Sequence, residues 1–346
     1  MVTGGCGFIG SNLIRYLIER EDVAVTNLDL LTYAGNPENL ADLDKYPRYR
    51  FVHGDVADAA AVREASDGVC AILHLAAESH VDRSIEDASA FVRTNVLGTQ
   101  VVLDEARRRG VRLVFVSTDE VYGALADEQD APFTEHSPLA PNSPYAASKA
   151  AGDLLARAWV RTYGADVVIT RCSNNYGPYQ FPEKFLPLMI VRALGGEPLP
   201  IYGDGLYRRE WLHVEDHCRG LIAAWREGRS GRAYNFGSGD ERANLELAEL
   251  VLRLTAEQVA PTKARITHVA DRPGHDRRYA VDASRACEEL SWRPTISLEQ
   301  GLQATVRWYV AHEPWWRRIV AGEHLVDRKT AHSQSPPNER PDRAKS

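Results

Sequence analysis

Two short segments of the chain carry side chains that can move protons. Tyr145 and Lys149 are four residues apart in a segment with helical spacing, so both side chains lie on one face. A tyrosine phenolate at pH 7 costs about 4 kcal/mol, because the reference pKa is near 10, and a neighbouring ammonium group can supply much of that energy. Such a pair is also common on ordinary helices, so it needs support from the rest of the sequence.

The second segment, Ser117–Gly123, places a hydroxyl group and two adjacent carboxylates after an apolar run. Thr118 can share a substrate oxygen with Tyr145. Asp119 and Glu120 repel each other, and enclosure in a cleft raises the pKa of such carboxyl groups, which suits a general acid and a general base. A solvated acidic loop is the alternative interpretation.

Regular elements are predicted to position these side chains. Over the first 175 residues, short apolar runs alternate with helical patterns, which predicts right-handed βαβ units and a parallel sheet. Ser143 and Pro144 are typical of an N-cap and a first helical position, so we expect a helix over residues 144–163. Open α/β sheets bind ligands at the carboxyl ends of their strands, where Ser117–Gly123 falls. The candidate strands are Met1–Thr3, Val23–Leu28, Tyr49–Val52, Cys70–Leu75, Arg112–Ser117 and Val167–Arg171.

A glycine-rich turn follows the first of these strands. Residues 4–10 read GGCGFIG, which satisfies G-x-G-x-x-G and opens a helix, as phosphate-binding turns do, although a tight structural turn has the same spacing. Asp29 ends the second strand 19 residues after Gly10, where a carboxylate can accept both ribose hydroxyls. An acid there repels a 2′-phosphate, so the sequence predicts NAD rather than NADP. Asp55 is either an adenine contact or a loop carboxylate.

Composition excludes several other classes of protein. The 346 residues include 48 acidic and 41 basic side chains, and the net charge of −7 argues against a nucleic-acid or anionic-membrane binder. No apolar run reaches the ~18 residues of a membrane span. Five scattered cysteines without C-x-x-C predict reduced thiols in the cytoplasm, and His213 and His217 lack a third ligand for zinc. We expect a cytoplasmic enzyme without a metal.

The segments that carry these motifs together resemble the dTDP-glucose 4,6-dehydratases, an extended branch of the short-chain dehydrogenase/reductase superfamily. The likeness covers roughly residues 1–316. The matching stretches are residues 3–12 (TGGCGFIGSN), 29–36 (DLLTYAGN), 74–85 (HLAAESHVDRSI), 117–123 (STDEVYG), 143–149 (SPYAASK), 171–184 (RCSNNYGPYQFPEK), 200–205 (PIYGDG) and 271–279 (DRPGHDRRY).

The resemblance implies a fold, a division into domains and an assembly. The fold class is α/β, a Rossmann-like doubly wound parallel sheet with a smaller, mixed α/β C-terminal substrate domain. Residues 1–177 would bind NAD, with a return of the chain near 211–237, and residues 178–326 would mainly bind the nucleotide sugar. Five prolines between residues 178 and 200 predict a loop-rich second region, and residues 327–346 read as a disordered tail. A homodimer built on a helix bundle is also implied. Only three residues precede the first glycine, so we expect the natural chain to begin a few residues earlier.

The resemblance also implies a reaction. Tyr145, helped by Thr118 and Lys149, would remove the proton of the sugar 4-hydroxyl while hydride leaves C4 for NAD. Glu120 would then remove the C5 proton, and Asp119 would protonate the departing 6-hydroxyl. Return of the hydride to C6 gives a 4-keto-6-deoxy sugar and restores the cofactor.

Further site residues carry over by position. The cofactor would meet Gly4, Gly7, Phe8, Ile9, Gly10, Asp29, Leu30, Leu31, Thr32, Asp55, Val56, Leu75, Ala76, Ala77, Ser79, Thr94, Tyr145, Lys149 and Asn175. The nucleotide sugar would meet Ser79, Thr118, Asn174, Lys184, Phe185, Pro200, Ile201, Tyr202, Arg209, Asn244, Arg272 and His275. Residues 208–211 (RREW) depart from the family's apolar-Arg-Asp-Trp pattern, which leaves open whether Arg208 or Arg209 faces the phosphates. Cys6 and Phe185 are milder departures.

Related NAD-dependent enzymes remain as alternatives. A 4-epimerase needs no elimination and usually lacks the acidic pair, whereas UDP-glucuronate decarboxylases and GDP-mannose 4,6-dehydratases tend to carry Ser-Glu where this chain has Asp119-Glu120. Asp119 therefore favours the dTDP-glucose enzymes. A non-catalytic NAD-binding regulator would be expected to lack Tyr145, Lys149 or the carboxylates. The choice of thymidine rests on the resemblance alone.

Overall fold

A seven-stranded parallel sheet forms the centre of the larger lobe. The computed structural model describes residues 1–126, 129–259, 262–271 and 276–323. Arg272, His275 and the tail expected at 327–346 lie outside these residues. The strand order is β10-β6-β5-β4-β1-β2-β3, which reverses direction between β1 and β4, the place where doubly wound sheets bind their ligands. The strands are β1 (Val2–Thr3), β2 (Val25–Asp29), β3 (Tyr49–His53), β4 (Ala71–His74), β5 (Arg112–Thr118), β6 (Val167–Cys172) and β10 (Ala233–Phe236).

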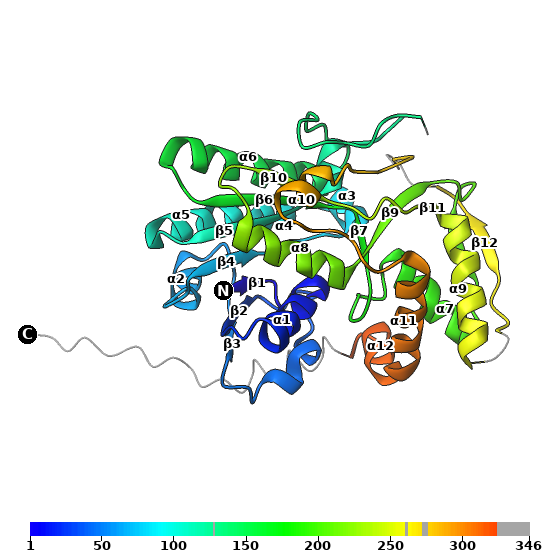
Figure 1. Cartoon of the computed structure of the whole chain (residues 1–346). Helices are drawn as coiled ribbons and strands as arrows, with labels where there is room; N and C mark the ends of the chain where they lie inside the picture. Colours follow the sequence, from blue (N-terminus) through cyan, green and yellow to red (C-terminus); the bar gives the residue numbers. More distant parts are fainter. Residues whose placement is uncertain (127–128, 260–261, 272–275, 324–346) are drawn as a thin grey trace, which may run out of the picture.

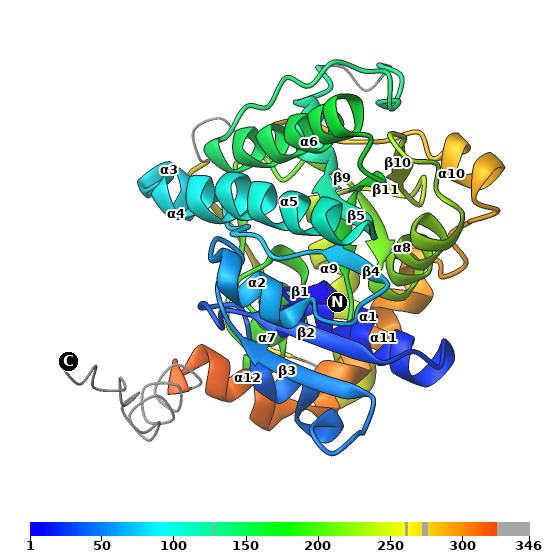
Figure 2. The ribbon, with the colours of Figure 1, turned by 90° about the vertical axis from the view of Figure 1, so that its left-hand side faces the viewer.

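Helices cover both faces of this sheet, and each face has its own apolar core. Leu13 and Leu17 of α1 pack in one core with Leu221 of α8, while Leu103 of α5 and Ala156 of α6 belong to the other. Figure 2 shows the sheet between these two layers. The helices of this lobe are α1 (Phe8–Arg20), α8 (Val214–Glu227), α2 (Ala59–Ala65), α5 (Thr99–Arg109) and α6 (Pro144–Tyr163).

The predicted boundaries hold closely where the sequence carries a capping signal. The helix expected over 144–163 is α6, and the Ser143 hydroxyl accepts a hydrogen bond from the Ala146 N–H at 3.1 Å. Strand β10, from a later part of the chain, pairs with β6 in parallel and forms the last strand of the sheet. The first strand has two residues rather than the three expected, and Val2 lies opposite both Asn27 and Leu73.

A smaller lobe lies at one end of the sheet (Figure 1). Its core includes Tyr176, Trp211, Trp315 and Trp316. Strands β11, β9 and β7 form a three-stranded sheet, and β12 pairs with β8. These elements are β7 (Asn174–Tyr176), β8 (Leu199–Tyr202), β9 (Arg208–His213), β11 (Glu241–Ala243), β12 (Ile266–Val269), α7 (Phe185–Gly195), α9 (Asn244–Val259), α11 (Leu298–Ala311) and α12 (Glu313–Val320).

The expectation of a loop-rich second region is wrong in part. Pro187 lies in the first turn of α7 and Pro200 lies in β8. A proline in the first helical turn loses no hydrogen bond, because the N–H groups there have no partner within the helix. The shorter helical segments are η1 (Pro37–Leu43), α3 (Val81–Glu86), α4 (Ser89–Phe91), the π-helical η2 (Val92–Gly98), η3 (Asp119–Tyr122) and α10 (Ser284–Glu289).

Candidate active site

One cavity runs along the carboxyl edge of the parallel sheet. It reaches from the glycine-rich turn after β1, past the loops after β2, β3 and β4, to the ends of β5 and β6. Most of the predicted cofactor residues and all five predicted catalytic residues line it. The structure therefore brings the glycine turn and the proton-transfer groups into one continuous space.

The glycine turn approaches its neighbours too closely for any side chain. Gly4 has φ +70°, and a Cβ there would lie 2.8 Å from the Ala76 backbone, while a Cβ at Gly10 would lie 2.2 Å from the Gly4 carbonyl oxygen. Helix α1 begins at Phe8, and no side chain caps it at Gly7. Its first N–H groups have no acceptor within the helix and belong to residues that line the cavity, an arrangement that suits a pyrophosphate.

Two carboxylates line the cavity beyond the glycine turn. Asp29 ends β2, and its oxygens accept hydrogen bonds from the Cys6 N–H at 2.8 Å and the Leu31 N–H at 2.7 Å. A carboxylate at the end of β2, facing the cavity, can accept hydrogen bonds from ribose hydroxyls. Asp55 pairs instead with Arg93 at 2.7 Å, so it is not a solitary loop carboxylate.

Tyr145 and Lys149 lie on the buried face of α6, beside Thr118 at the end of β5. Burial and the charge of Glu120 raise the pKa of Tyr145 well above its usual value, and the hydrogen bond with Thr118 acts in the opposite direction. The Lys149 ammonium donates to the Val116 carbonyl oxygen at 2.7 Å, and burial lowers its pKa to about 8. In the free chain, tyrosine is therefore neutral, and lysine is mostly charged at pH 7.

The two carboxylates differ in their surroundings. Asp119 is 2% exposed, and burial, followed by the charges of Glu120 and Glu210, raises its pKa well above the usual value. The Thr118 hydroxyl donates to Asp119 Oδ1 at 3.2 Å, whereas Oδ2 is buried with no hydrogen-bond partner among the residues that the structure describes. Glu120 is only partly buried. Asp119 is thus suited to hold and donate a proton, and the more accessible Glu120 is suited to accept one.

The predicted substrate residues divide between the two lobes. Ser79, Asn174 and Lys184 line the cavity, and Lys184 Nζ donates to the Ser79 carbonyl oxygen at 2.8 Å. Ile201 is fully buried in the apolar core of the smaller lobe and does not line the cavity. Five other predicted substrate residues do not line the cavity: Phe185, Pro200, Tyr202, Arg209 and Asn244. Among the predicted cofactor residues, Leu31 does not line it either.

The surroundings of Arg208 and Arg209, the two arginines of the segment that departs from the family pattern, differ. Arg209 is 6% exposed, lies over the ring of Tyr279 at 4.5 Å, and donates to the Asp276 carbonyl oxygen at 2.8 Å. Its charge also acts on Asp119. Arg209, rather than Arg208, therefore lies near the catalytic carboxylates.

Several cavity residues were not predicted. Glu183 lines the space, and the Tyr33 hydroxyl donates to it at 2.8 Å. Each of these residues lies inside a stretch quoted for the resemblance, so its position in a motif was the available signal. The other unpredicted lining residues are Leu28, Ala34, Gly35, Gly54, Val116, Ser117, Cys172, Ser173, Gln180 and Phe181.

Comparisons with known proteins agree on one group. Residues 1–305 match a family model described as GDP-mannose 4,6 dehydratase. The chain is 54% identical to a dTDP-glucose 4,6-dehydratase of Streptomyces griseus, over 94% of this chain and 98% of that protein. The structure of DesIV, a dTDP-glucose 4,6-dehydratase of Streptomyces venezuelae with NAD bound, is 52% identical, with a TM-score of 0.87 over 92% of this chain and 98% of that one. A UDP-glucose 4-epimerase of Thermotoga maritima is 30% identical, with a TM-score of 0.81 over 90% and 98% of the two chains.

The doubly wound sheet, the glycine turn and the Tyr145/Lys149 helix define a short-chain dehydrogenase/reductase of the extended type. Since an epimerase shares this fold, the fold does not select a reaction. The sequence identity selects among these enzymes, because it is about one half over nearly the whole length. The chain belongs to the dTDP-glucose 4,6-dehydratase family.

Proposed function

We propose that the chain converts dTDP-glucose to dTDP-4-keto-6-deoxyglucose and water, with NAD as a cofactor that is restored in each turnover. One observation carries the proposal: a buried carboxyl group with a raised pKa, Asp119, and a second carboxylate, Glu120, share a cavity with the Tyr145/Lys149 pair. Elimination of water needs both an acid and a base, and epimerisation needs neither carboxyl group.

The residues present fit NAD. The hydroxyl groups of Ser117 and Ser173 line the cavity and are buried without a hydrogen-bond partner in the described part of the chain, so they are available to a polar ligand. Asp29 disfavours a 2′-phosphate. When bound, NAD accepts the hydride of C4 and returns it to C6.

Tyr145 acts as the base for the 4-hydroxyl proton. In the free chain, burial and Glu120 keep its phenol protonated. Two positive charges, the Lys149 ammonium and the nicotinamide ring of bound NAD, favour the phenolate, so the base forms when the cofactor is in place. Thr118 donates to the same substrate oxygen and holds it against Tyr145.

Asp119 and Glu120 divide the elimination. Glu120 takes the C5 proton, which the neighbouring 4-ketone makes acidic, and the C5–C6 double bond forms as the 6-hydroxyl leaves with the Asp119 proton as water. Hydride then bonds to C6, and the proton held by Glu120 returns to C5. The proton that Tyr145 took from the 4-hydroxyl group is released to solvent, and Asp119 regains a proton from solvent. The sum is loss of one water, with no net oxidation.

The nucleotide sugar extends from this site toward the smaller lobe. We assign its pyrophosphate to Lys184 and Arg209, because two cations balance the two negative phosphates. Residues 1–177 with the return near 211–237 serve as the cofactor-binding domain, and residues 178–326 serve mainly as the substrate domain.

Assembly and compartment complete the proposal. Four exposed apolar side chains on the helices of one outer face support a homodimer: Ile85, Val92, Leu97 and Leu154 are 42–55% exposed. Light scattering of the purified protein tests this assembly.

All five cysteines are free thiols, which supports a cytoplasmic location. No helix in the described part of the chain is long and apolar enough to cross a membrane.

A panel of nucleotide sugars tests the substrate. The purified chain is incubated with dTDP-glucose, UDP-glucose, UDP-glucuronate and GDP-mannose, and the products are identified by NMR. We expect a 4-keto-6-deoxy product from dTDP-glucose. Turnover of another member of the panel, with dTDP-glucose unchanged, would refute the assignment of thymidine.

A further inference from the structure

A buried arginine outside the reacting groups touches both segments that carry them. Arg171 on β6 is 2% exposed, and its guanidinium forms a two-bond ion pair with Asp153 at 2.9 and 2.8 Å. Asp153 lies on α6, one turn beyond Lys149. A third bond runs from Arg171 to the Tyr122 hydroxyl at 2.7 Å. Tyr122 is the last residue of η3, the one-turn segment that begins with Asp119.

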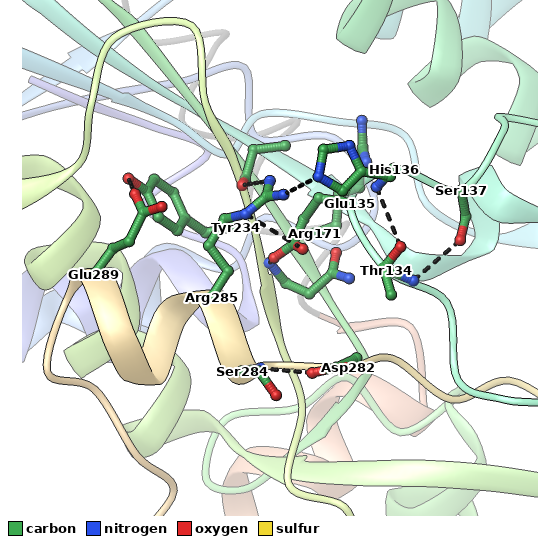
Figure 3. A network of polar contacts seen from close by, with 12 residues as sticks. Thr134, Glu135, His136, Ser137, Arg171, Tyr234, Asp282, Ser284, Arg285 and Glu289 are labelled. Atoms are coloured by element: carbon green, nitrogen blue, oxygen red, sulfur yellow. Dashed lines mark hydrogen bonds and ion pairs between the residues drawn. The ribbon is translucent and has the colours of Figure 1, made fainter.

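The Tyr122 hydroxyl continues this network into β10. It donates to Asn235 Oδ1 at 2.7 Å, and the Asn235 side chain donates to the Phe133 carbonyl oxygen at 3.0 Å. The Tyr122 ring stacks on Phe133, with centroids 5.1 Å apart. The outer part of the network includes Glu135 and the Arg285 side chain, and Figure 3 shows Arg171 beside it.

The η3 segment spans four residues, and Val121 and Tyr122 are buried in one apolar cluster with Ala150 of α6 and Val281. Its backbone hydrogen bonds include the Gly123 N–H bond to the Glu120 carbonyl oxygen at 3.2 Å and the Ala140 N–H bond to the Val121 carbonyl oxygen at 3.0 Å. Thr118 differs, because it pairs with Cys172 in the sheet. Thr118 is therefore fixed by the sheet, whereas the Tyr122 hydroxyl adds a polar link from η3 to Arg171 and, through it, to Asp153 of α6.

We propose that Arg171, acting through Tyr122, is a positioning residue that holds the Asp119/Glu120 pair in register with the helix that carries Tyr145. Loss of this link slows the elimination of water while the C4 oxidation continues. The inference rests on the proposed function, since it separates two steps of that reaction.

Tyr122→Phe is the most conservative test. The substitution keeps the buried ring and its stacking and removes only the hydroxyl. Tyr234→Phe is the matched control, because Tyr234 is also fully buried in the larger lobe and its hydroxyl makes two hydrogen bonds, to Arg229 and Glu289, that touch neither catalytic segment. Figure 3 shows Tyr234 on the far side of the network from Thr134.

The readout is the transient absorbance of reduced nicotinamide at 340 nm in a single turnover of the NAD-loaded enzyme with dTDP-glucose. We expect Tyr122→Phe to keep the rate of the rise and to slow the decay about tenfold or more, so that reduced cofactor accumulates. Tyr234→Phe should match the wild type in both phases. An unchanged decay in Tyr122→Phe, or an equal slowing of the rise and the decay, would overturn the inference. Absence of any turnover in the wild-type chain would overturn the proposed function, and the inference with it.

Arg171→Lys tests the arginine itself. Lysine keeps a charge for Asp153 but lacks the planar fork that holds two partners at once. The decay should slow as in Tyr122→Phe, and the double variant should be no slower than either single variant, because both remove the same link. Additive effects in the double variant would show two independent roles and contradict the inference.

Discussion

Replacement of Asp119 by asparagine separates the steps of the reaction most cleanly. The amide matches the carboxyl group in size, and its carbonyl oxygen can still accept the Thr118 hydroxyl bond that Asp119 Oδ1 accepts at 3.2 Å. Burial and the charge of Glu120 raise the pKa of Asp119 and so favour its neutral carboxyl group, which the neutral amide resembles in charge. It removes the proton that the 6-hydroxyl needs.

The size of the effect follows from the enclosure of this side chain. A positioned general acid contributes about 10²–10⁴-fold to a rate. Asp119 is 2% exposed and its Oδ2 is buried, so bulk water cannot replace it as the donor. We therefore expect the upper half of that range, a loss of about 10³–10⁴ in the elimination step, equivalent to about 4–5 kcal/mol.

The assay again follows reduced nicotinamide at 340 nm in a single turnover. The rise should remain within a few-fold of the wild-type rate, and the decay should nearly vanish. A substrate with fluorine in place of the 6-hydroxyl serves as the control, because fluoride leaves with little help from a proton, and it should restore much of the decay. Elimination of water by Asp119→Asn at close to the wild-type rate would refute the role of Asp119 as the acid.

Three further predictions concern other parts of the site. The folded pKa of Lys149, about 8, lies below its unfolded value of 10.5, so its buried charge lowers stability below pH 8, and stability is regained as pH rises from 8 to 10.5. Lys149→Met should raise the free energy of unfolding of the cofactor-free chain by up to about 3 kcal/mol at pH 7, measured by urea titration, and a less stable variant would contradict this. The same variant should slow C4 oxidation at least about 100-fold. Asp29→Asn removes one of two acceptors for backbone N–H groups and should weaken NAD binding about tenfold by calorimetry, with equal affinity disproving the ribose assignment. Gly10→Ala places a methyl group 2.2 Å from the Gly4 oxygen, and retention of NAD by this variant on gel filtration would argue against the tight phosphate turn.

Local signals in the sequence predicted the larger lobe well. Ser143 followed by Pro144 marks the start of α6, and Asp29 ends its strand as expected, because capping and strand-end positions depend on neighbouring residues. The direction of the pKa shift at Asp119 was also predictable, since adjacent carboxylates in a cleft disfavour ionisation.

Long-range packing limited the rest. The burial of Ile201 depends on apolar partners from distant helices, so its motif did not show that the residue lies in a core and not in the cavity. Arg171 belongs to a quoted motif, but its partners Asp153 and Tyr122 are 18 and 49 residues away in sequence. Proline-based expectations failed at Pro187 because the position within a helix, not the residue type alone, decides the cost.

The central claim is that one bound cofactor takes hydride from C4 and returns it to C6 of the same sugar while water is lost. The most direct measurement uses dTDP-glucose with deuterium at C4, incubated with the purified protein without added NAD, followed by mass spectrometry of the product. We predict loss of one water and deuterium at C6. Loss of water with the label absent from C6, or an unchanged sugar in a protein that retains NAD, would contradict the account.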